Sequence, residues 1–70
     1  MDIAIKNTLN EIAMQIKVAR RSVKDIAAEC TYFAKQITDS EAQSIFSALA
    51  SCRTRKQMSL VLGNFWVSHE

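Results

Sequence analysis

Side chains that could carry out catalytic chemistry are few in this chain of 70 residues. The only imidazole belongs to His69, and the only thiols belong to Cys30 and Cys52. These side chains are too few for a four-ligand zinc site, and no carboxylate is placed to orient His69 as the base beside a cysteine nucleophile. The sequence therefore predicts neither a catalytic centre nor a metal site.

Turn-forming residues are almost absent, since the chain has one Gly, Gly63, and no Pro. Phosphate-binding loops, dinucleotide-binding turns and calcium-binding EF-hand loops all need glycine at defined positions. We therefore expect a protein that is not an enzyme and that uses no cofactor. The same composition predicts a few long elements, because most tight turns need Gly or Pro.

Basic side chains form the first candidate binding feature. Four of them recur at the spacing of one helical strip, namely Lys17, Arg20, Arg21 and Lys24. Arg53, Arg55 and Lys56 could extend this strip, and a surface of this kind can follow a nucleic-acid backbone. The alternative is an ordinary solvated face, because Asp25 and Glu29 dilute the charge and the net charge is only +2. A basic strip opposite an apolar face could also lie on an anionic membrane surface.

An unbroken apolar repeat is the strongest signal in the sequence. Apolar residues follow one another at alternating steps of four and three, which is the heptad spacing of coiled coils. We call this set the seam, and its members are Ile5, Leu9, Ile12, Ile16, Ala19, Val23, Ile26, Cys30, Phe33 and Ile37. Neither Gly nor Pro interrupts it, so the spacing predicts one helix over residues 3–37, about 50 Å long at ~1.5 Å per residue. Thr8 and Glu11 have the spacing of a capping box and leave open a start at residue 9.

The second half of the chain predicts a returning arm. The run Thr-Asp-Ser at residues 38–40 consists of helix-capping residues and indicates a tight turn. An apolar face follows over residues 41–52, loses its phase at residues 53–56 and resumes over residues 55–66, which indicates a bent or broken second arm. A strand over residues 60–67 is the less favoured alternative, because a lone strand has no partner.

The predicted fold is therefore all-α, an antiparallel helical hairpin in one small domain over residues 1–70. The arms differ in length, so about two turns of the first helix have nothing to cover them. Soluble monomers rarely expose an apolar strip of this kind. We expect a homodimer or a hetero-complex with another helical protein to cover Ile5, Leu9, Ile12 and Ile16. The alternative is that the first ten residues fray.

Two further pairs of residues each allow two interpretations. Phe65 and Trp66 could anchor a protein interface, or they could close the core at the end of the last helix. Cys30 and Cys52 are expected to be small buried hydrophobic residues with reduced thiols, and a disulfide between them is the alternative.

Because catalytic, metal and phosphate-binding sites are not predicted, we expect the protein to act by docking one helix on another. The sequence predicts a non-enzymatic protein-protein interaction module, such as a small regulator, an inhibitor or a co-chaperone. The alternative is a nucleic-acid-associated regulator that uses the basic strip. Two cysteines, together with the absence of any apolar run near eighteen residues, predict a cytoplasmic protein without a membrane span.

Two families illustrate this class. The predicted layout resembles the small helical-hairpin co-chaperones of type III secretion needles. The run from Ile37 to Arg53 is similar to the middle of the haemolysin-expression-modulating family of gene-silencing cofactors, and it departs where that family has an acidic pair and an aromatic-rich end. Both serve as examples of the class and not as identifications.

Overall fold

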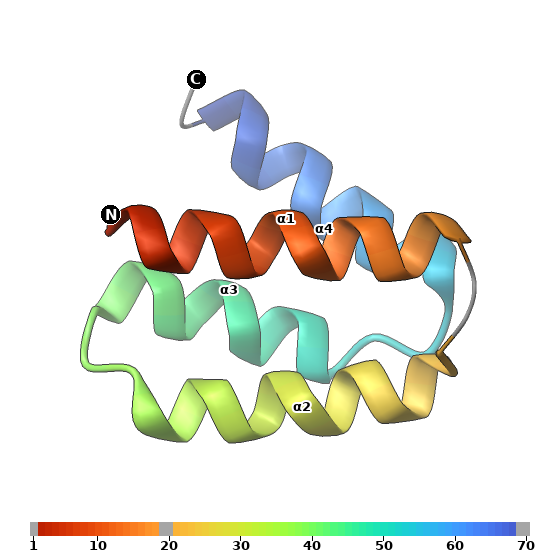
Figure 1. The fold of residues 1–70 in the computed structure, drawn as a ribbon, viewed down its shortest axis with the longest axis horizontal. Coiled ribbons are helices and arrows are strands. Elements are labelled where there is room, and N and C mark those ends of the chain that lie inside the picture. Colours follow the sequence, from red (N-terminus) through yellow and green to blue (C-terminus); the bar gives the residue numbers. More distant parts are fainter. Residues whose placement is uncertain (1, 19–20, 69–70) are drawn as a thin grey trace.

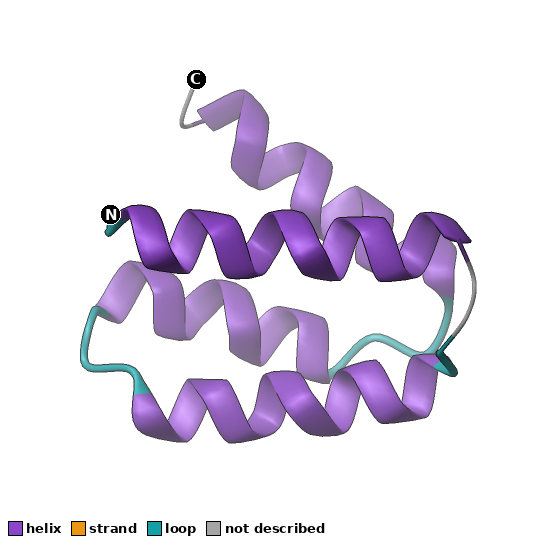
Figure 2. Ribbon diagram, in the orientation of Figure 1, coloured by secondary structure: helices purple, strands orange, loops and turns teal. Residues whose placement is uncertain are grey.

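The structure is a computed structural model, and it describes residues 2–18 and 21–68. These residues form four helices (Figure 1), which are α1 (Ile3–Val18), α2 (Val23–Gln36), α3 (Ser40–Ala50) and α4 (Arg55–Ser68). The described residues contain no strand (Figure 2), so the predicted all-α class is confirmed. The alternative strand over residues 60–67 is wrong, because this segment lies within α4. None of the described helices has both the length and the apolar character needed to cross a bilayer.

The single long helix expected over residues 3–37 is not found, and four helices replace the two arms of a hairpin. The chain leaves the helical path before Val23, where Ser22 takes extended backbone angles of φ −70° and ψ 153°. The Ser22 hydroxyl oxygen accepts a hydrogen bond of 3.1 Å from the backbone N–H of Asp25. Ser22 is therefore an N-cap, and it starts a new helix that runs in another direction. The longest dimension of the molecule is accordingly 27 Å.

Helix α1 begins at Ile3 and not at residue 9. The Asp2 carboxylate accepts a hydrogen bond of 3.0 Å from the backbone N–H of Ala4, which caps the first turn. Thr8 is not a cap, since its hydroxyl donates to the carbonyl oxygen of Ala4 one turn earlier, at 3.0 Å. The first ten residues are thus helical in the structure from Ile3 onward.

The other two helix boundaries lie at the turn expected over residues 38–40 and at the phase break expected over residues 53–56. Asp39 caps α3, because its carboxylate accepts from the backbone N–H groups of Glu41 and Ala42 at 2.9 and 3.0 Å. Thr54 and Gln57 form a reciprocal capping box at the start of α4. The Thr54 hydroxyl accepts from the N–H of Gln57 at 3.1 Å, while the Gln57 side-chain oxygen accepts from the N–H groups of Arg53 and Thr54.

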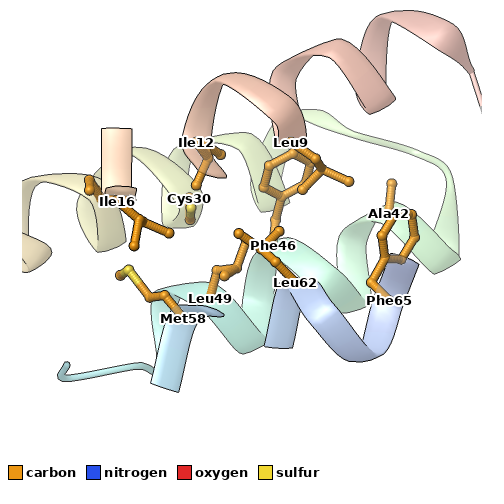
Figure 3. Packing of buried hydrophobic residues seen from close by; sticks show 11 residues of the cluster. Leu9, Ile12, Ile16, Cys30, Ala42, Phe46, Leu49, Met58, Leu62 and Phe65 are labelled. Carbon is orange, nitrogen blue, oxygen red and sulfur yellow. The ribbon is translucent and has the colours of Figure 1, made fainter. Parts of the chain in front are cut away.

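The four helices pack around one apolar core. Helices α2 and α3 are antiparallel neighbours, and α4 packs against both α1 and α3. The end of α1, the start of α2 and the α3–α4 link lie at one end of the molecule, opposite the start of α1 and the α2–α3 turn (Figure 1). Every helix contributes to the core (Figure 3), which contains Leu9, Ile12, Ile16, Ile26, Cys30, Ala42, Phe46, Leu49, Met58, Leu62 and Phe65.

This packing removes the uncovered strip expected on the first helix. Leu9 is 0% exposed and Ile12 is 1% exposed, because the chain's own helices cover them. Splitting the first arm yields helices of 16 and 14 residues, close in length to the 14 residues of α4. No overhang remains, so the length argument for a dimer does not apply to this structure.

Candidate docking groove between α1 and α4

The basic residues expected on one helical strip are divided by the α1–α2 link. Lys17 lies in the last turn of α1, Arg21 lies in the link, and Lys24 lies at the start of α2. Arg20 falls outside the described residues. The expected strip on one helix is therefore not present, since helical spacing does not continue through the bend at Arg21.

Arg21 is engaged within the chain. Its guanidinium donates to the Glu29 carboxylate at 2.7 Å and to the Gln15 side-chain oxygen at 3.1 Å. The hydrogen bond to Glu29 raises the pKa of Arg21 above its ordinary value. Because Glu29 neutralises it, Arg21 adds little to an anion-binding surface.

Arg55 connects α4 to the end of α1. Its guanidinium donates to the backbone carbonyl oxygen of Ile16 at 3.4 Å and to that of Arg21. These contacts bring the start of α4 beside the end of α1 and Arg21. Arg55 and Lys56 of the second predicted basic group therefore lie near Lys17 of the first group, and all three line one groove.

A groove of about 430 Å³ lies between α1 and α4. Its base is apolar, because Ile16 and Leu62 are buried core residues and Trp66 is half-buried beside them. Small residues, namely Ala13, Ser59 and Gly63, line the walls of the groove. A Cβ added at Gly63, one of the lining residues, would meet no heavy atom within 4 Å, so this wall opens to solvent.

Cations line this groove, and acids do not. Lys17 on α1 and Lys56 on α4 are exposed residues that line the groove. Arg55 also lines it, and its guanidinium donates to the carbonyl oxygen of Arg21. Within the described part of the chain, Lys17 and Lys56 make no ion pair, while the Arg55 guanidinium is used on backbone carbonyls. Two lysines therefore line an apolar groove without an ion-pair partner among the residues that the structure describes.

Exposed apolar side chains concentrate on the same two helices. Among the described residues, five of the six large exposed ones lie on α1 or α4, namely Ile3, Met14, Val18, Leu60 and Val67. On α4, Ser59, Gly63 and Trp66 form one row along the groove. Leu60 and Val67 lie three residues before and four residues after Gly63, so they form an apolar row next to it. The apolar surface of α4 thus continues outward from the groove.

The six residues expected at an interface divide into two groups. Leu9, Ile12, Ile16 and Phe65 are core residues, and Ile5 and Trp66 are half-buried. Only Ile16 and Trp66 of the six line the groove. Of the predicted basic residues, the groove is lined by Lys17, Arg55 and Lys56. Lys24 and Arg53 are exposed and lie outside the groove.

The groove also includes residues that the sequence interpretation missed. The interface residues predicted from the sequence do not include Ala13, Ser59, Leu62 and Gly63. Their spacing could have identified the α4 wall, because steps of four and three connect Ser59 to Gly63 and Gly63 to Trp66. Nothing in the sequence pairs that row with Ala13, which lies more than forty residues earlier.

The two cysteines differ in burial. Cys30 lies in the core, where burial first, and the nearby Glu29 carboxylate second, raise the pKa of its thiol to about 11. Cys52 is half-buried, and its thiol donates to the carbonyl oxygen of Ala48 at 3.3 Å. Both are free thiols, so the alternative disulfide is not formed. His69 lies outside the described residues, and no three potential metal ligands cluster among the residues that the structure describes.

A second groove, of about 480 Å³, lies between α2 and α3. It is lined mainly by short alanine, serine and threonine side chains, with Lys35 and Gln43. The Gln43 side chain donates to the carbonyl oxygen of Ala34 at 3.1 Å and so spans from one helix to the other. This groove has one cation and no large apolar or aromatic side chain, which makes it the weaker candidate.

Comparison with known proteins adds no relative to this description. No family model matches the chain, and neither a curated protein nor a solved structure does. The function proposed below is therefore argued from the residues of the groove.

Proposed function

We propose that this protein is a non-enzymatic protein-binding module, of the kind that serves as a small regulator, an inhibitor or a co-chaperone. Its binding surface is the groove between α1 and α4. The observation that supports this proposal is the coincidence, in one groove, of an apolar base, an open glycine wall and two lysines that make no ion pair with any described residue. We place the protein in the cytoplasm, where the Cys30 and Cys52 thiols stay reduced.

The apolar part of the groove supplies the affinity in this proposal. Aromatic residues in partly desolvated pockets are typical anchors of protein interfaces, and Trp66 is half-buried at such a position. The exposed Leu60 and Val67 enlarge the apolar area next to it. Trp66 then takes both of the roles considered for it, since it packs on the core and lines the groove.

In this proposal Lys17 and Lys56 orient the partner and increase the rate of association. Charges at the rim of an interface mainly accelerate association and exclude wrong partners, and they contribute little affinity. Lys17 and Lys56 lie on opposite walls of the groove, so a partner would meet one ammonium group from each helix.

A nucleic-acid-associated regulator is the second candidate, favoured by the proximity of the two basic segments at one end of the molecule. The cations left for phosphates are fewer than the sequence suggested. Arg21 is paired with Glu29, and Arg55 is bound to backbone carbonyls. Of the cations predicted to contact a polyanion, those left within the described residues are Lys17, Lys24, Arg53 and Lys56. About four phosphate contacts support weaker binding, with a shallower dependence on salt, than the six to ten of strong DNA-binding proteins.

Affinity capture from the host with three immobilised proteins tests the main proposal: the wild type, Gly63→Gln and Gly63→Ala. Glutamine fills the open side of the groove, whereas alanine adds one methyl group and leaves the groove open. We expect a partner that the wild type and Gly63→Ala retain equally and that Gly63→Gln loses.

Equal retention by all three proteins would place binding elsewhere and refute the groove. Sedimentation of the wild type over a concentration series then distinguishes a hetero-complex from a homodimer. Recovery of nucleic acid that is lost on nuclease treatment would favour the second candidate.

A further inference from the structure

We infer that the partner segment is an acidic amphipathic helix, with its carboxylates at one end and its apolar residues at the other. This inference rests on the proposed function and specifies the chemistry of the partner. It follows from how charge and apolar surface are distributed along the groove.

The groove has the shape that receives a helix. Its α4 wall runs from Arg55 to Trp66, eleven steps along the helix at ~1.5 Å each, or about 16 Å, which is three helical turns. A third helix lying along two packed helices buries one apolar face at helical spacing. Ala13 and Ser59 have small side chains and Gly63 has none, so the backbone of the docked helix can approach closely.

The two ends of the groove differ in chemistry. Lys17 is in the last turn of α1 and Lys56 is in the first turn of α4, and the contacts of Arg55 bring these two turns together. The cations of the described groove lining, Lys17, Arg55 and Lys56, therefore lie at one end of the groove. Trp66 and Gly63 lie two to three turns further along α4, at the apolar end.

The difference between the basic end and the apolar end of the groove determines which ligand fits. A carboxylate near Lys17 and Lys56 gains two counter-charges and meets no acidic lining residue. A basic segment would place like charges together at the same end, which is unfavourable. A phosphate backbone would find cations at only one end of the groove and apolar surface along the rest.

Selection of a random 15-residue peptide library on the whole protein, with Gly63→Gln for counter-selection, tests the inference. Trp66 is the only tryptophan of the chain, so its fluorescence reports occupation of the groove. We expect the enriched peptides to carry a net negative charge and apolar residues at helical spacing. We also expect their binding to change Trp66 fluorescence.

Charge reversal provides the matched comparison. The double variant Lys17→Glu/Lys56→Glu is expected to weaken binding of the selected peptides about tenfold, as two reversed rim charges imply. The control Lys24→Glu/Lys35→Glu reverses two exposed lysines outside the groove and should stay within about twofold of the wild type. Circular dichroism and unfolding midpoints show whether each variant keeps its fold.

The possible outcomes separate the two proposals. Groove-dependent peptides that are neutral or basic, or that bind equally to both double variants, overturn the inference and leave the protein-binding groove intact. A random single-stranded DNA pool that displaces the peptides and binds more tightly also overturns it. If no selected peptide distinguishes the wild type from Gly63→Gln, this inference fails, and host capture decides the proposed function separately.

Discussion

Arg55 joins three segments of the chain through one guanidinium group. It begins α4, and it donates to the carbonyl oxygens of Ile16 in α1 and Arg21 in the link. The last carbonyls of a helix have no partner within the helix, and a cation near them is favourable. Arg55 therefore stabilises the end of α1 and, at the same time, sets the basic end of the groove.

Replacing Arg55 by alanine removes these hydrogen bonds. We expect Arg55→Ala to lower the free energy of unfolding by about 1–3 kcal/mol, as for hydrogen bonds from a charged donor. Arg53→Ala is the control, because the exposed Arg53 makes no side-chain hydrogen bond or ion pair among the described residues. Urea unfolding followed by circular dichroism measures both, and equal midpoints would contradict the structural role of Arg55.

Cys30 stays protonated further into the alkaline range than an ordinary thiol, because burial raises the pKa of its thiol to about 11. We expect native Cys52→Ser protein, with Cys30 as its only cysteine, to react with a disulfide reagent at pH 8 at least about tenfold more slowly than the same protein in denaturant. The folded state holds this proton more tightly than the unfolded state, whose thiol pKa is near 9. The contribution of Cys30 to stability is thus complete below pH 9 and is lost as the pH rises through 11. Native reactivity equal to that of the unfolded chain would show that Cys30 is not buried.

At the scale of elements, the seam runs through a helix boundary without losing phase. Ile16 near the end of α1 and Ile26 in α2 are both buried in the common core. The repeat reports only that each helix has one buried face, so it cannot distinguish one long helix from two helices that share a core. The residue that marks the boundary is Ser22, which has the capping-box spacing with Asp25.

The cap at Ser22 can be removed without touching the core. We expect Ser22→Ala to lower the free energy of unfolding by about 1 kcal/mol, because the N–H of Asp25 loses its acceptor. Ser22→Asn is the control, since asparagine provides an equivalent acceptor and should be nearly neutral. Thermal unfolding by circular dichroism gives both values. A more stable and more helical Ser22→Ala variant would indicate that α1 and α2 join into one helix.

For the molecule as a whole, the core is completed within one chain. Eleven buried apolar residues come from all four helices, and no buried polar or charged side chain is found among the described residues. A core in a chain of this length supplies only about 3–5 kcal/mol of net stability. Each large core side chain therefore represents a substantial share of the total.

Two apolar residues of α1 test this arrangement. Leu9 is 0% exposed and Ile3 is 74% exposed. We expect Leu9→Ala to cost about 3 kcal/mol and to leave much of the protein unfolded at 25 °C, whereas Ile3→Ala should change stability by less than about 0.5 kcal/mol. Far-UV circular dichroism with urea titration provides the comparison. If Leu9→Ala keeps its stability as a monomer, or changes only the association state, then Leu9 lies at an interface and not in this core.

Several features of this protein follow from its sequence alone. The all-helical class, the turn at residues 38–40 and the break before Arg55 depend on local patterns of capping and apolar spacing, which act within a few residues. These patterns are present in the printed chain, and the structure agrees with them.

Only the tertiary structure decided what covers the seam and where the groove lies. Leu9 and Ile12 were expected to face a second chain, but the chain's own helices bury them, because apolar spacing identifies a buried face and not the element that buries it. The groove likewise combines Lys17 with Lys56, which are far apart in sequence and close only because α1 packs on α4. A single sequence contains no local signal for such a pairing, so the candidate site became visible only once the four helices were in place.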